Sequence, residues 1–162
     1  MIWTALILGY VTLARLIELA IARRNTAGLI KIGAVEYGAD HYPWMVAMHL
    51  AWIIGLLVFA WSRPIEPVPL VIFGVLQIFR LWVFVTLGRR WTTRIFIIPG
   101  ETLVAAGPYR WFRHPNYYVV IGEIAALPLS FGMIGFALLF SLLNAVMLFV
   151  RIRAEEAALK LV

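Results

Sequence analysis

Apolar residues fall into five runs that are separated by short polar segments. The runs extend over about residues 2–22, 44–61, 67–87, 115–129 and 133–150. A helix that crosses a membrane needs ~20 mostly apolar residues, so a chain of 162 residues has room for about five such helices and short connections. The pattern therefore predicts an all-α integral membrane protein with about five transmembrane helices.

The limits of the runs predict how they are connected. Only Ser130, Phe131 and Gly132 separate the last two runs, which favours a tight helical hairpin, although the fourth run is short for a complete crossing. The first run lacks the basic start and the cleavage site of a signal peptide, so we expect a retained helix. We expect one membrane domain over 1–162, with three spans in 1–88 and a loop, the hairpin and a C-terminal helix in 89–162.

Composition supports a membrane protein and excludes several other classes. Hydrophobic residues make up 64% of the chain and charged residues 14%, whereas soluble domains have about 45–50% and ~25%. This excludes a disordered chain, a nucleic-acid-binding module and a secreted disulfide scaffold. The chain has no Cys, so it has no thiolate nucleophile or Cys-ligated zinc, and three scattered His do not predict a metal site.

The net charge of +6 is distributed at the ends of the apolar runs and not over one face. Of the 14 Lys and Arg residues, 11 follow the first, third or fifth run, while only Arg63 follows the second. Loops on the cytoplasmic side of a membrane carry an excess of Lys and Arg. We therefore expect the N-terminus outside and the C-terminus in the cytoplasm, and no nucleic-acid partner.

The segment 89–114 is long for a connection in so compact a protein, and it is rich in Gly, Pro, aromatic residues and Arg. Long loops of this kind are usually functional. The segment leads into a helix that begins at Pro115, and free N–H groups at a helix start can bind an anionic or polar ligand. The side chains expected around this start are Arg110, Arg113, His114, Asn116 and Tyr117. An anchor among lipid headgroups is the alternative.

A second polar cluster continues the last apolar run out of the membrane. Arg151 and Glu155 are four residues apart, so they share one face of a helix, and Glu156 follows them. The cluster lies at the same cytoplasmic level as the helix start at Pro115. A pair of opposite charges can fix a zwitterionic ligand, whereas a solvated helix exit is the alternative because exposed ion pairs contribute little.

Ionisable side chains also lie inside the apolar runs, where charges are costly and are functional candidates by default. Arg15 and Glu18 are three residues apart in the first run, Arg80 lies in the third, and Glu123 lies in the fourth. These groups can also neutralise one another as structural pairs. His49 is expected to be a core histidine and not a ligand.

The string Gly107–Tyr117 (GPYRWFRHPNY), followed by a hairpin and then Arg151, Glu155 and Glu156, resembles the isoprenylcysteine carboxyl methyltransferase family. Members are integral membrane enzymes that transfer a methyl group from S-adenosyl-L-methionine. The resemblance covers about residues 94–160, and the first three helices match only in hydrophobicity and number. The cofactor contacts that it implies are Glu101, Thr102, Leu103, Val104, Tyr109, His114, Pro115, Asn116, Tyr117 and Glu155.

The resemblance also implies a reaction and a substrate class. The short form is similar to bacterial members that O-methylate phenolic or pyrone lipids, so we expect an inner-membrane enzyme whose lipophilic substrate, such as a prenylcysteine or a phenolic lipid, enters laterally. Arg151 would bind an ionised carboxylate, and Glu123 or Glu155 would be the general base for a phenol. Eukaryotic members have a basic, Tyr-containing tail, which this sequence does not show, so another segment is expected to close the site.

Two other functions stay open at this point. A membrane reductase that uses NADPH would need the same Arg-rich loop for phosphates, although no Gly-rich phosphate-binding pattern is present. A non-enzymatic membrane scaffold would explain the spans but not the gathering of Arg, His, Tyr and Glu. Gly9, Gly55 and Gly74 lie in predicted helices and allow close packing in a homodimer.

Overall fold

The computed structural model describes residues 1–102 and 104–159. Within them the chain forms five α-helices, α1 (Ile2–Lys31), α2 (Tyr42–Phe59), α3 (Pro67–Leu87), α4 (Pro115–Leu129) and α5 (Ile134–Leu159). The short elements are the strands β1 (Val35–Tyr37) and β2 (Ile95–Ile97) and the 3-10 helices η1 (Ala39–His41), η2 (Gly88–Arg90) and η3 (Gly107–Arg110). The protein is therefore all-helical apart from one small strand pair.

Proline and glycine mark several helix ends. Pro67 and Pro115 are the first residues of α3 and α4, where the missing N–H of proline costs no hydrogen bond. Helix α3 ends at Gly88, whose φ of +49° is rarely adopted by other residues. Local sequence thus sets both ends of α3 and the start of α4, which is the helix that carries the candidate site.

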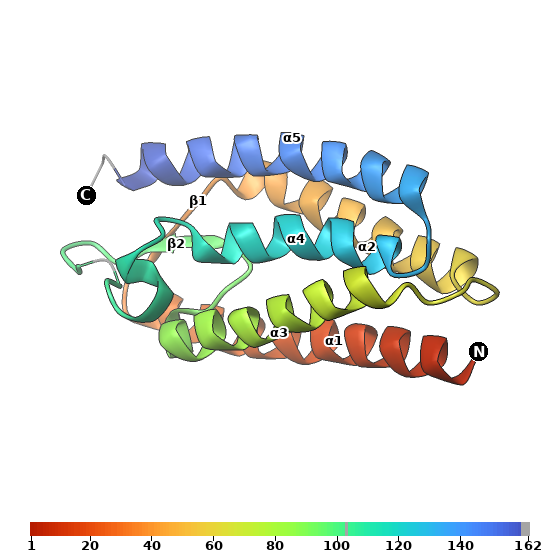
Figure 1. Cartoon of the computed structure of the whole chain (residues 1–162). Coiled ribbons are helices and arrows are strands. Elements are labelled where there is room, and N and C mark those ends of the chain that lie inside the picture. Colours follow the sequence, from red (N-terminus) through yellow and green to blue (C-terminus); the bar gives the residue numbers. More distant parts are fainter. Residues whose placement is uncertain (103, 160–162) are drawn as a thin grey trace.

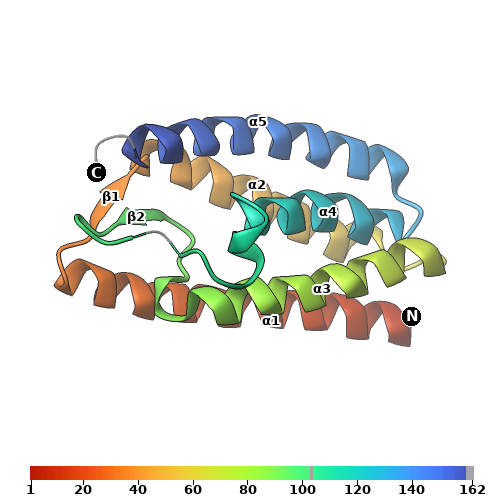
Figure 2. The same cartoon turned by 60° about the vertical axis from the view of Figure 1, so that its left-hand side comes forward.

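The helices run between the two ends of an elongated bundle (Figure 1). In both ribbon views, α1 and α3 lie on one side of the bundle, α2 and α5 on the opposite side, and α4 between them (Figures 1 and 2). Helix α4 packs against both α3 and α5, and the second of these pairs is the predicted hairpin. Close approach depends on Gly122, where a Cβ would lie 2.6 Å from a methyl carbon of Leu76 in α3.

The length of α4 sets it apart from the other helices. Helices α1, α2 with η1, α3 with η2, and α5 are each long and apolar enough to cross a membrane. Helix α4 has 15 residues, which extend roughly 22 Å at about 1.5 Å per residue, against ~30 Å of hydrocarbon. The expectation of about five spans is refined to four long apolar helices of an integral membrane protein, with a short, buried helix between them.

The expected loop over 89–114 contains regular structure. Strand β2 pairs antiparallel with β1, with Val35 opposite Ile97 and Tyr37 opposite Ile95. Arg94 donates a hydrogen bond to Glu36 at 2.8 Å, and its guanidinium lies 4.4 Å from the centre of the Tyr42 ring. The strand pair therefore ties the connection after α1 to the connection after α3 at the end of the bundle where α5 ends (Figure 1).

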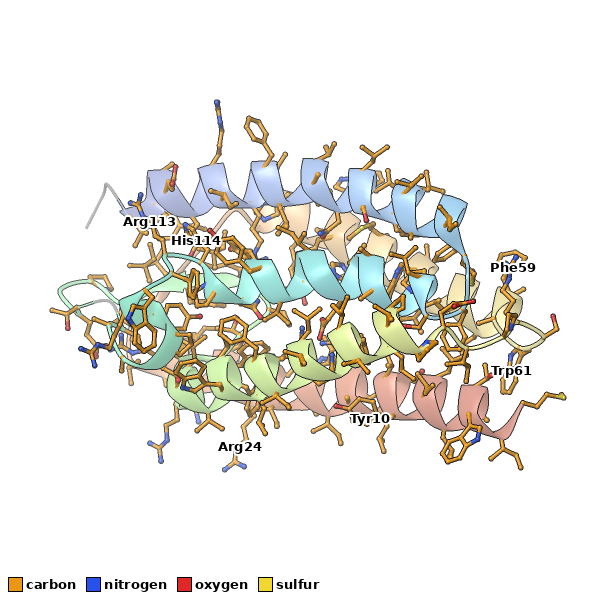
Figure 3. The ribbon with its side chains drawn as sticks, in the orientation of Figure 1. Tyr10, Arg24, Phe59, Trp61, Arg113 and His114 are labelled. Atoms are coloured by element: carbon orange, nitrogen blue, oxygen red, sulfur yellow. The ribbon has the colours of Figure 1, made fainter. Side chains whose placement is uncertain are left out.

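The two ends of the bundle differ in their side chains. Figure 3 shows Arg113 and His114 at the end that holds the strand pair, and Phe59 and Trp61 at the opposite end. Over the outer surface of the helices the exposed side chains are mostly large and apolar, as at Trp3 and Leu142, which are 70% and 68% exposed. Such a surface suits contact with lipid.

Candidate functional site

A cavity of about 440 Å³ lies at the end of the bundle that holds the strand pair. Its wall is formed by the ends of α1 and α3, strand β2, the segment 98–105, η3, the start of α4 and the last turns of α5. Segments from across the whole chain therefore meet there. The wall holds four Arg and two Glu side chains, and the excess of Arg favours anionic ligands.

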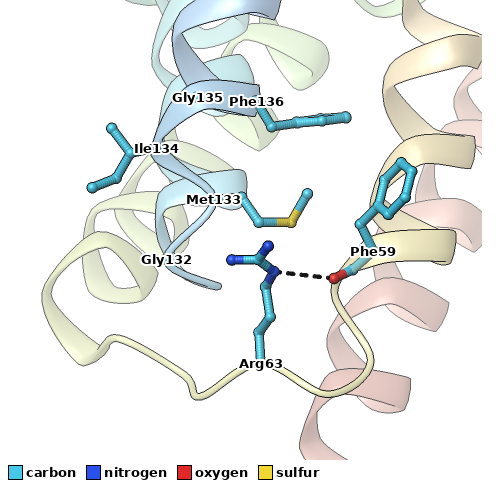
Figure 4. Close-up of a pocket in the computed structure, with 7 residues that line it drawn as sticks. All are labelled: Phe59, Arg63, Gly132, Met133, Ile134, Gly135 and Phe136. Carbon is cyan, nitrogen blue, oxygen red and sulfur yellow. Dashed lines mark hydrogen bonds between the residues drawn. The ribbon is translucent and has the colours of Figure 1, made fainter.

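A second pocket, of about 390 Å³, lies at the opposite end, between the end of α2 and the start of α5 (Figure 4). Its single ionisable side chain is Arg63, whose Nε donates to the carbonyl oxygen of Phe59 at 3.2 Å. Gly132, Met133 and Phe136 form much of the rest of its wall. Because it offers no acid and no paired charges, the larger cavity is the candidate site.

The centre of the candidate site is a chain of hydrogen bonds between α4 and α5. Arg151 Nε donates to the hydroxyl oxygen of Tyr117 at 3.0 Å, and that hydroxyl donates to Glu155 Oε2 at 2.5 Å. Arg151 Nη1 also donates to the carbonyl oxygen of Thr93, which precedes β2, at 2.9 Å. Arg151 is 8% exposed and Tyr117 9%, so the geometry of both side chains is fixed.

Glu155 receives a second contact from the residue that precedes α4. His114 Nδ1 lies 3.5 Å from Glu155 Oε2, and the His114 ring stacks on Tyr117 with 5.2 Å between ring centres. Both contacts use Oε2. Within the described residues, Oε1 of Glu155 has no hydrogen-bond partner, and the carboxylate side chain is 29% exposed. One oxygen of this carboxylate is therefore available to a ligand.

Unpartnered polar atoms gather around the same cavity. Among residues 1–102 and 104–159, the buried side-chain polar atoms without a hydrogen bond are Trp91 Nε1, His114 Nε2 and Asn116 Oδ1. All three residues line the cavity. Buried polar groups are almost always paired in folded proteins, so three exceptions at one place indicate that the site is completed by a polar ligand.

The segment 98–105 forms the outer edge of the cavity. Arg90 forms an ion pair with Glu101, and its Nη1 donates to the carbonyl oxygen of Thr102 at 2.9 Å. Val104 also lines the cavity, whereas Leu103 lies outside the described residues. Arg90 therefore holds this segment against η2.

Tyr109 of η3 brings a hydroxyl group to the cavity wall. Burial raises the pKa of the Tyr109 phenol above its ordinary value, and the negative charge of Glu155 raises it further. The phenol is consequently neutral at physiological pH. It can donate a hydrogen bond to a ligand but cannot act as an anion.

Glu123 lies apart from this cavity, inside the helix bundle. Its Oε2 accepts hydrogen bonds from Arg15 at 2.9 Å and from Arg80 at 2.8 Å, and its Oε1 accepts one from Gln77 at 2.6 Å. Arg15 and Arg80 also pair with Glu18, at 2.7 and 2.6 Å. The expected pairs thus exist, but they are joined into one charge-balanced cluster that leaves neither oxygen of Glu123 free.

His49 and Pro115 do not line the cavity and have structural contacts instead. His49 Nδ1 lies 2.8 Å from the carbonyl oxygen of Met45, one turn earlier in α2, as expected of a core histidine. Pro115 is buried at the start of α4 and does not line the cavity. It fixes the helix start that positions its two neighbours, His114 and Asn116.

The structure gathers most of the expected site residues around one cavity. Those that line it are Glu101, Thr102, Val104, Tyr109, His114, Asn116, Tyr117, Arg151 and Glu155. Arg90 and Trp91 line it as well; the sequence placed them in the functional segment 89–114 but did not single them out as contacts. An Arg pair followed by Trp at the end of a predicted span is typical of a membrane-interface anchor, so no local signal distinguished these two residues.

Comparison with known proteins gives three findings. The profile of the isoprenylcysteine carboxyl methyltransferase (ICMT) family matches residues 68–161, starting in α3 and thus earlier than the expected residue 94. The uncharacterized protein YpbQ of Bacillus subtilis is 40% identical over 166 residues, which cover 99% of this chain and 97% of YpbQ. An uncharacterized protein of Haemophilus influenzae is 27% identical over 153 residues, covering 90% of this chain and 88% of that protein.

No solved structure shows significant similarity to the chain. The family match extends over more than half of the sequence and includes α4, α5 and the segments that form most of the cavity. The chain belongs to the isoprenylcysteine carboxyl methyltransferase family.

Proposed function

We propose that the protein is an integral-membrane O-methyltransferase that uses S-adenosyl-L-methionine and methylates an acidic oxygen of a lipophilic substrate. Family membership suggests a membrane methyltransferase. The observation that supports it most directly is the cavity in which Arg151, Tyr117 and Glu155 form one hydrogen-bonded chain beside two unpartnered polar side chains of the α4 start.

The chemistry of the cavity wall fits this cofactor. Glu155 Oε1 and Asn116 Oδ1 are acceptors without partners among the described residues, as an ammonium group requires. At the start of α4, Pro115 has no N–H and the N–H of Tyr117 donates to the carbonyl oxygen of His114, so the N–H of Asn116 is the group that suits a carboxylate. The neutral hydroxyl of Tyr109 and the unpartnered Nε2 of His114 can hydrogen-bond to the uncharged parts of the molecule. When bound, the cofactor supplies an electrophilic methyl group carried on a sulfonium.

The residues of the chain would act mainly by positioning the acceptor, which dominates catalysis of displacement reactions. Arg151 would hold an acidic oxygen through its guanidinium, which Tyr117 and Thr93 keep in place. A carboxylate is already ionised and needs only this cation, whereas a phenol also needs a base. We assign that base to Glu155 and not to Glu123, because three donors occupy the oxygens of Glu123.

The charge distribution supports a cytoplasmic location for the site. The cavity wall holds Arg90, Arg94, Arg113 and Arg151, whereas the pocket at the opposite end of the bundle holds only Arg63. By the positive-inside rule, this distribution supports a cavity at the inner face of the membrane. A polar cofactor would reach it from the cytoplasm, and an apolar substrate would reach it from the lipid.

Calorimetric titration of the detergent-purified protein with S-adenosylmethionine tests this proposal. We expect saturable binding that is lost in Glu155→Ala. The neighbouring Glu156→Ala is the matched control, since Glu156 is 42% exposed and makes only a 3.7 Å contact with Arg113. Binding of NADPH in place of S-adenosylmethionine would identify a reductase. Binding of neither molecule would favour a membrane scaffold and contradict the proposal.

A further inference from the structure

Trp91 differs from the other two residues with unpartnered polar atoms. It does not belong to the start of α4 but follows η2 at the end of α3, and it is 3% exposed. Its ring packs on Phe84 with 5.1 Å between ring centres, and the guanidinium of Arg80 lies 5.8 Å from its ring centre. Asn25 of α1 donates to its carbonyl oxygen at 2.8 Å. Trp91 is thus held from several sides while its indole N–H has no partner.

The cavity wall near Trp91 includes apolar side chains. Leu29 at the end of α1 and Leu87 at the end of α3 line the cavity there, and α1 contacts η2 directly. The charged pair Arg151 and Glu155 instead comes from α5. Trp91 therefore brings a hydrogen-bond donor to a part of the wall that also holds apolar side chains.

Packing alone does not account for a tryptophan at this position. A phenylalanine would contact the same neighbours without burying an N–H, and a buried donor without a partner costs stability. An indole N–H can only donate a hydrogen bond, so a partner must offer a lone pair. An oxygen meets this requirement, whereas an ammonium group does not.

We propose that the indole N–H of Trp91 binds an oxygen of the methyl acceptor, whose apolar part lies against Leu29 and Leu87. This inference rests on the proposed methyltransferase function and adds Trp91 to the residues that would bind the acceptor. The acceptor carries a hydrogen-bond-accepting oxygen at the boundary between its polar head and its hydrocarbon part.

The test replaces the indole by a ring that lacks the N–H. In Trp91→Phe, we expect the KM for 4-dodecylphenol or N-acetyl-S-farnesylcysteine, whichever the wild type methylates, to rise roughly three- to tenfold, the effect of one hydrogen bond. The Kd for S-adenosylmethionine should stay within about twofold, because that hydrogen bond belongs to the acceptor alone. Trp82→Phe is the control, since Trp82 is 44% exposed and does not line the cavity.

A measurement on the wild type keeps the inference testable if Trp91→Phe does not fold. Used as competitive inhibitors, 4-dodecylphenol should bind roughly three- to tenfold more tightly than dodecylbenzene, which lacks the oxygen. Equal binding of the two compounds overturns the inference, and so does an unchanged acceptor KM in folded Trp91→Phe. A rise in the Kd for S-adenosylmethionine alone would place Trp91 in the cofactor site instead. Failure of the wild type to bind S-adenosylmethionine would count against the proposed function itself.

Discussion

At Tyr117, one hydroxyl group connects the two charged side chains of the site. It accepts a hydrogen bond from Arg151 and donates one to Glu155, at 3.0 and 2.5 Å. These contacts align a cation from one turn of α5 with a carboxylate from the next. The neighbouring Tyr118 is 57% exposed and makes no contact with either group, so the two tyrosines form a matched pair for mutagenesis.

Tyr117→Phe should lower kcat roughly tenfold to a hundredfold, because small displacements of positioning groups have effects of this size. The protein should stay folded, since the ring and its stacking on His114 remain. Methyl transfer measured with radiolabelled S-adenosylmethionine gives the result, and Tyr118→Phe should leave kcat unchanged. Wild-type activity in Tyr117→Phe would show that the bridge does not position Arg151.

The cluster of Arg15, Glu18, Arg80 and Glu123 shows what the sequence could not specify at the residue scale. The sequence suggested the pair Arg15–Glu18, which are three residues apart, and the pair Arg80–Glu123, because both residues lie in apolar runs. The joining of both pairs depends on the neighbourhood of α1, α3 and α4, and no sequence pattern encodes that neighbourhood. The sequence therefore could not predict whether the carboxylate oxygens of Glu123 are free for catalysis or occupied by hydrogen bonds.

Glu123→Gln should destabilise the fold while sparing the cofactor site. Breaking a buried ion pair costs about 3–5 kcal/mol, and the side chain of Glu123 is 5% exposed. SDS-induced unfolding in mixed micelles measures the loss, with the exposed Glu66→Gln as control. The Kd of the folded variant for S-adenosylmethionine should stay within about twofold, because the cluster lies outside the cavity. Unchanged stability together with lost activity would instead support a catalytic role for Glu123.

For the helices, the positions of charged residues predicted where the apolar runs end better than they predicted where the helices end. Helices α3 and α4 have the predicted limits, and proline or glycine stands at both ends of α3 and at the start of α4. Helix α1 continues past Arg23 to Lys31, and α5 continues past Val150 to Leu159. Charged residues end an apolar run, but they do not end a helix, which keeps its backbone hydrogen bonds in water.

Patterns of apolar and polar residues did not predict the strand pair or the position of the segment 98–105. Strands of three residues are too short for an alternating pattern to be detected. Their pairing also joins segments that are about 60 residues apart in the sequence. The sequence did indicate that 89–114 carries function, and the structure shows that it forms one wall of the cavity.

The ion pair between Arg90 and Glu101 gives a prediction for this wall. Arg90→Ala should raise the Kd for S-adenosylmethionine by up to about fivefold, since exposed ion pairs contribute roughly 0–1 kcal/mol. Glu101→Ala should have a similar effect, and the double variant should add little, because both changes remove one interaction. High salt should reduce the difference from wild type. Additive effects of the two substitutions would show that Glu101 contacts the ligand independently of Arg90.

At the scale of the whole molecule, the absence of Cys offers a direct test of orientation. Ser62 lies in the connection after α2, and Ala106 precedes η3 at the opposite end of the bundle; both are exposed. In intact bacterial cells, a membrane-impermeant maleimide should label Ser62→Cys. It should label Ala106→Cys only after lysis, because the proposed orientation places that end in the cytoplasm. The reverse pattern would place the cavity outside.

The short α4 has a consequence for biosynthesis. When α1 to α3 have emerged from the ribosome, Arg15 and Arg80 face Glu18 alone, and one positive charge in the bilayer is left without compensation. Helix α4, with 15 residues, is too short to be retained by the bilayer alone and would enter together with α5. Insertion of α4 would bring Glu123 into contact with Arg15 and Arg80. The first residues of the same helix form part of the cavity wall. Insertion of α4 and α5 would thus complete both the membrane bundle and the cavity in one step.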